Sequence, residues 1–174
     1  MSTRSCRSLT GIVFALILFS CSRDHKSSSK FEVIRADRTL SGSSAYPVAA
    51  DPSRIGTYSP DAHSGAGYFY DEVLEYRVWL HPENGATPLN GRNDYFVAFA
   101  QYEVAEAFSK RTSGSELPLV LVRQVEWIDE PERGHFVPRK EERITEWQTQ
   151  WLAGDKRTPN SIAEFLKHPR ESGP

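Results

Sequence analysis

The sequence predicts a small single domain of the α+β class, with a three- or four-stranded sheet and two or three helices. Apolar patterns typical of strands lie on both sides of a segment with helical apolar spacing, in the order strand, strand, helix, strand. The length of 174 residues suits one domain, and 25% charged with 39% hydrophobic residues is typical of a globular chain.

The first two strands are predicted from two different apolar patterns. Residues 74–80 alternate, which places Leu74, Tyr76, Val78 and Leu80 on one face of a strand that ends before Pro82. Residues 95–100 are apolar on both faces. The second strand is therefore expected in the middle of the sheet.

A helix and a third strand follow. Residues 101–111 have helical spacing, with Val104, Ala105 and Phe108 on one stripe, and Gly114 follows as a stop signal. Residues 119–128 are rich in β-branched residues and predict a strand. Because a helix joining two strands usually forms a crossover, the second and third strands are expected to be parallel.

Two further elements complete the predicted domain. Residues 142–152 fit either a helix or a strand, and Gly154 just after them favours the helix. A last helix is predicted to start with Thr158 as N-cap and Pro159 at its first position. Its apolar residues are Ile162, Phe165 and Leu166.

The N-terminal segment has the pattern of a signal peptide over residues 1–20. Two arginines precede an apolar run at residues 9–19, which is shorter than the ~20 residues that span a bilayer. The run ends in Leu18-Phe19-Ser20-Cys21, which resembles a bacterial lipoprotein signal. An ordinary cleaved signal peptide, or a start codon placed too far upstream, would give a similar pattern.

The lipoprotein resemblance implies a place for the mature chain. It implies that Cys21 carries the lipid and that the protein is anchored in the cell envelope through its acyl chains. Ser22 after the cysteine resembles the pattern sorted to an outer membrane, with the domain facing the periplasm. Residues 21–57 contain several Ser and Gly turns and are interpreted as a flexible tether, and residues 58–174 as the domain.

Composition excludes several classes of site. A net charge of −2 argues against a nucleic-acid-binding protein, which needs an excess of Lys and Arg. Two cysteines exclude a disulfide framework and a cysteine zinc site. The histidines lack metal-ligand spacing, and residues 63–67 lack the order of a nucleophile elbow. No metal, cofactor or catalytic residue is therefore predicted.

Five polar or aromatic residues within predicted strands are candidates for ligand binding: Arg77, Trp79, Arg123, Glu126 and Trp127. Their strand neighbours are apolar, so each charged side chain must reach the sheet edge or meet an opposite charge. An Arg–Glu pair within the sheet would be structural. Arginine could instead bind an anionic ligand through two parallel hydrogen bonds.

A second resemblance covers residues 65–168. The segments 67–72, 75–79, 128–131 and 157–159 are similar to a family of short, uncharacterised bacterial proteins. Its members are often labelled GCN5-related N-acetyltransferases. The label implies acetyl-CoA as cofactor, held by a glycine-rich signature where a strand leads into a helix. The nearest approach to that signature is residues 111–115, at the end of the predicted helix.

Two functions follow from these observations. The first is a lipid-anchored envelope protein whose domain binds a small ligand or an envelope partner without catalysis. The second is an acetyltransferase-like enzyme that uses acetyl-CoA.

Overall fold

A computed structural model describes residues 44–60, 62, 68–91, 93–153 and 156–169 of the chain. The predicted signal peptide, the predicted lipid-bearing Cys21 and residues 22–43 of the predicted tether lie outside these residues. Among the residues described, no helix is both long and apolar enough to cross a membrane.

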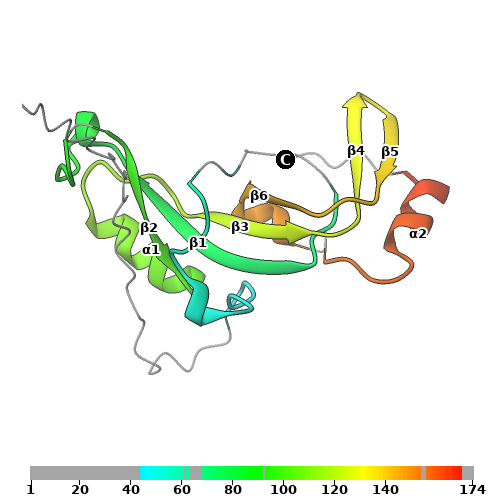
Figure 1. The fold of residues 1–174 in the computed structure, drawn as a ribbon, viewed down its shortest axis with the longest axis horizontal. Helices are drawn as coiled ribbons and strands as arrows, with labels where there is room; N and C mark the ends of the chain where they lie inside the picture. The colour runs from blue at the N-terminus through cyan, green and yellow to red at the C-terminus, as the bar shows by residue number, and fades with distance from the viewer. Residues whose placement is uncertain (1–43, 61, 63–67, 92, 154–155, 170–174) are drawn as a thin grey trace, which may run out of the picture.

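The main element is a four-stranded antiparallel sheet in the order β2-β1-β3-β6 (Figure 1). Its strands are β1 (Glu72–Leu80), β2 (Tyr95–Phe99), β3 (Leu119–Gln124) and β6 (Arg143–Gln148). The residues described also form two α-helices and a second, two-stranded sheet, which confirms the predicted α+β class.

The second and third strands run parallel, as predicted, but they are not neighbours, and β2 lies at the edge of the sheet rather than in its middle. The strands β2 and β3 each pair with β1 in the antiparallel sense, so they run in the same direction but are separated by β1. Helix α1 (Tyr102–Arg111) packs on β1 and β2 and leads the chain across β1 to β3. The predicted crossover correctly implied that β3 runs parallel to β2. The position of β3 in the sheet follows from its pairing with β1, which lies between β2 and β3.

The predicted strand at 119–128 is two strands. Strand β3 ends at Gln124, and β4 (Trp127–Glu132) begins a hairpin with β5 (His135–Arg139). Gly134 turns this hairpin with a φ of +79°, a conformation that favours glycine. The hairpin and α2 (Ser161–Lys167) lie together at one end of the molecule (Figure 1).

The prediction of a helix at residues 142–152 is wrong. Its residues form β6, which pairs with β3 along its length, followed by a short 3-10 helix at Thr149–Leu152. Thr145, Trp147 and Thr149 are buried in alternation, which is the strand pattern that the sequence also allowed. Pairing with an apolar strand outweighed the helix-stop signal at Gly154.

The two predicted helices are present with altered ends. Helix α1 ends at Arg111 with Thr112 as C-cap, before the predicted stop signal at Gly114. Helix α2 begins at Ser161 with Asn160 as N-cap, so the predicted start at Thr158 is two residues early. The Ser161 hydroxyl instead accepts a hydrogen bond from the Thr158 amide.

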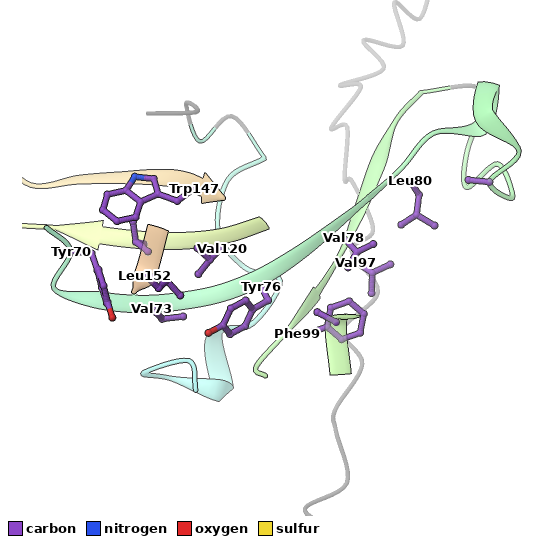
Figure 2. Packing of buried hydrophobic residues seen from close by; sticks show 13 residues of the cluster. Tyr70, Val73, Tyr76, Val78, Leu80, Val97, Phe99, Val120, Trp147 and Leu152 are labelled. Atoms are coloured by element: carbon purple, nitrogen blue, oxygen red, sulfur yellow. The ribbon is translucent and has the colours of Figure 1, made fainter. Parts of the chain in front are cut away.

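The largest hydrophobic cluster lies on the sheet face that is covered by α1 and by the 3-10 helix Thr149–Leu152, and Figure 2 shows its side chains. Tyr76 and Val78 of β1 and Trp147 of β6 point into it. A bulge in β1 between Val73 and Glu75 interrupts the alternation. Leu74, predicted on the Tyr76 face, therefore packs with Tyr58 and Leu121 instead.

Residues 44–60, here called the strap, are packed on the domain. The Ala49 amide donates to the Ala100 carbonyl, and the Ala50 amide donates to the Val73 carbonyl. The side chains of Ala49 and Ile55 are buried. Residues 44–57, predicted to belong to the tether, are therefore part of the folded domain, which begins earlier than residue 58.

The helix–sheet contact can be tested through Phe108, whose ring is partly buried and packs 5.2 Å from the Phe99 ring. Phe108→Ala removes that contact and should lower the free energy of unfolding by about 2–3 kcal/mol, below the ~3–5 kcal/mol range for fully buried rings. Lys110→Ala, at a side chain 65% exposed, should change it by less than about 0.5 kcal/mol. Equal urea midpoints for the two variants would contradict the packing of α1.

Candidate functional site

The sheet face opposite α1 carries a buried cluster of charges centred on Arg77. Arg77 is fully buried, and its Nε donates to Glu75 Oε1 at 2.7 Å. Its Nη2 donates to the Ser59 carbonyl at 2.9 Å, and its guanidinium lies 4.2 Å from the centre of the Phe96 ring. Its Nη1 lies 3.6 Å from Glu146 Oε1 and makes no hydrogen bond to a described residue. These contacts enclose the guanidinium within the protein.

Glu146 completes the cluster from β6. Burial raises the pKa of its carboxyl, and the nearby Arg77 charge and the Trp79 indole act in the opposite direction. Trp79 Nε1 lies 3.2 Å from both carboxylate oxygens of Glu146. The effect of burial is the larger one, so the pKa of Glu146 lies above that of an exposed glutamate.

Arg77 and Trp79 were candidates for ligand binding, and the structure gives both of them partners inside the protein. Arg77 has no exposed surface while the strap covers it, so its guanidinium does not contact a dissolved ligand in this structure. The geometry favours the structural role that the sequence left open for an Arg–Glu pair. The acidic partners are Glu75 and Glu146.

Arg123 meets an acid at the end of the sheet. Its Nε and Nη2 lie 3.0 and 2.9 Å from Glu72 Oε2. Glu72 belongs to β1 and lies directly opposite Arg123 in the sheet. Glu142 lies 3.9 Å away. The hydrogen bond to Glu72 raises the pKa of the guanidinium. With 32% of its side chain exposed, Arg123 is the candidate arginine that solvent reaches.

Glu126 and Trp127 lie at the base of the hairpin. Glu126 lies 3.5 Å from Arg157 Nη1, and Arg157 Nε donates to Asp71 Oδ1 at 2.7 Å. The Trp127 ring is covered by the Arg143 guanidinium, 3.2 Å from its centre. The five candidates therefore do not form one site: Arg77 and Trp79 belong to the Arg77 cluster, whereas the other three lie where β3 leads into β4.

Two acidic members of the Arg77 cluster were missed by sequence reasoning. Glu75 precedes Arg77 by two residues, and the period of a strand places both on one face. That signal was present in the sequence. Glu146 had no usable signal, because its segment was predicted to be a helix.

A second charged cluster lies at the end of β1, around His81. Asp94 Oδ2 lies 3.0 Å from His81 Nδ1, and Glu116 Oε1 lies 3.0 Å from Nε2. The hydrogen bond with Asp94 contributes most to raising the pKa of the imidazole, and the Glu116 carboxylate raises it further. The imidazole thus links the segments that precede β2 and β3.

The His81 cluster does not have the form of a metal site. The two carboxylates face opposite nitrogens of one ring, so they cannot converge on an ion that the same ring binds. Across the described part of the chain, no group of three His, Cys, Asp or Glu side chains is placed to hold a metal.

Comparison with known proteins identifies no relative: no protein-family model, no curated protein and no solved structure matches this chain.

The His81 contacts predict a pH-dependent stability. Because folding raises the pKa of His81, its contribution is complete below the unfolded value of about 6.5 and is lost as the pH rises through the folded value. His81→Gln should therefore lower the free energy of unfolding by up to about 1 kcal/mol near pH 5.5 and by much less near pH 9. Urea unfolding of both proteins at the two pH values measures this, and a difference that does not change with pH would contradict it.

Proposed function

We propose that the protein is a lipid-anchored protein of the cell envelope whose α+β domain binds a partner or ligand without catalysis. The observation that carries the proposal is the sequence Leu18-Phe19-Ser20-Cys21 at the end of an eleven-residue apolar run. The run has the length of a signal-peptide core rather than that of a spanning helix.

The proposed anchor follows from the chemistry of Cys21. Acyl chains on this cysteine would hold the mature chain in a bilayer, each buried methylene contributing about 0.8 kcal/mol. Several chains together give stable attachment where one chain gives reversible binding. Ser22 supports an outer-membrane position with the domain facing the periplasm.

A non-catalytic domain is supported by the way its charges are used. Arg77, Arg123 and Arg157 are each held by a carboxylate at 2.6 to 2.9 Å. A group that transfers protons or attacks a substrate needs a reactive atom directed toward the reactants. Charges engaged in this way stabilise the fold and shape its surface instead.

The acetyltransferase alternative gains no support from the junction where acetyl-CoA would bind. Strand β2 leads into α1 through Ala100 and Gln101, without a glycine. Residues 111–115 lie at the carboxyl end of α1, where the helix dipole is unfavourable for a phosphate. We therefore propose the binding role alone.

The anchor is tested by metabolic labelling with radioactive palmitate in a bacterial host. The natural chain should incorporate the label, and Cys21→Ala should lose it, because the thiol that accepts the lipid is removed. Cys6→Ala is the matched control, since it removes the other cysteine of the chain and should keep the label.

Two results of this experiment would reject the proposal. One is label in the Cys21→Ala chain equal to that in the natural chain. The other is a natural chain that is expressed and carries no label.

A further inference from the structure

The strap is held by side chains of the sheet that contact its main chain. The Gly56 amide donates to Glu75 Oε2 at 2.7 Å, and the Ser59 carbonyl accepts from Arg77 Nη2 at 2.9 Å. Both partners on the sheet are fully buried. The Glu75–Arg77 pair therefore recognises one backbone donor and one backbone acceptor, three residues apart.

Apolar side chains of the strap pack on either side of these two contacts. Ile55 is 4% exposed and lies in a cluster with Phe96 and Ala98. Tyr58 is 6% exposed and packs with Leu121. Proteins that bind peptides commonly combine main-chain hydrogen bonds, which give affinity, with pockets for particular side chains, which give specificity.

The strap also carries local contacts that set its shape. Asp51 caps the 3-10 helix Pro52–Arg54, and Thr57 donates to the Arg54 carbonyl through both its amide and its hydroxyl. The Arg54 guanidinium lies 4.7 Å from the centre of the Tyr58 ring. Gly56, at a φ of +75°, completes the turn. A separate peptide of residues 51–60 contains every residue that makes these local contacts.

Burying a charge pair in a core has a large desolvation cost. Removing two charges from water costs several kcal/mol per ion, and apolar residues of the same shape would often give equal or greater stability. The pair does supply what apolar residues cannot, namely a specific alignment of the strap backbone. This use of charge fits a face that selects a peptide.

We propose that the face formed by Glu75, Arg77, Phe96 and Leu121 is a peptide-recognition surface that the strap occupies in this structure. The partner it fits is a peptide with a short turn containing the pattern Ile-Gly-x-Tyr, the pattern of residues 55–58. This inference rests on the proposed binding role and names its partner class. The attached strap competes at the high effective concentration of a linked segment, so it regulates access to the surface.

The test uses the full chain and a fluorescent peptide of residues 51–60. The double variant Ile55→Asp, Tyr58→Asp places two carboxylates where the strap is buried, which should release it. Fluorescence anisotropy should show peptide binding to this variant at least about tenfold tighter than to the natural chain. A control peptide with Ile55→Asp should bind the variant at least about tenfold more weakly than the natural peptide.

A folded variant that binds neither peptide, or both equally, would overturn the inference.

Hydrogen exchange of the natural chain tests it independently, in case the variant does not fold. The Gly56 amide should exchange at least about tenfold faster than the amides of Val78 and Val120, because the strap opens while the sheet stays folded. Equal rates for all three would show that the strap opens only with the whole domain, which also overturns the inference. Palmitate labelling is independent of both experiments, so a failure here is distinguishable from a failure of the anchor.

Discussion

The hydrogen-bonded pair of Glu75 and Arg77 is the interaction on which one whole face of the domain depends. Neither side chain has exposed surface, and their nearest charged atoms lie 2.7 Å apart. A charge at that depth is tolerated only when partners replace the water it has lost. Those partners come from the strap, from β2 and from β6, so the pair links segments that are distant in sequence.

The two faces of the sheet are therefore stabilised by different physics. One face packs apolar and aromatic side chains, among them Tyr76, Phe99 and Trp147 (Figure 2). Toward the strap the sheet buries charges that specify how a backbone must lie. The first face supplies burial of apolar surface, which is non-directional. The second supplies alignment, and this difference is why we assign recognition to the strap face.

The sequence predicted the parts of the fold that local periodicity determines. The alternation of 74–80 and the helical spacing of 101–111 each gave an element that the structure contains. The segment 142–152 fitted both periods, and only its pairing with β3 decided between them. The strap could not be recognised, because its Ser, Gly and Pro content is that of a linker and its burial depends on contacts across the sheet. Glu75 could have been found from its spacing to Arg77, whereas Glu146 could not.

A double-mutant cycle between Glu75 and Arg77 tests the central claim most directly. Arg77→Met leaves Glu75 and Glu146 buried beside an apolar side chain and should lower the free energy of unfolding by about 3–5 kcal/mol. Adding Glu75→Gln to that variant should recover part of the loss, giving a coupling energy of about 2 kcal/mol or more from urea unfolding. The account would be contradicted if the losses of unfolding free energy in the two single variants sum to the loss in the double variant within about 0.5 kcal/mol. The two side chains would then not act as a pair.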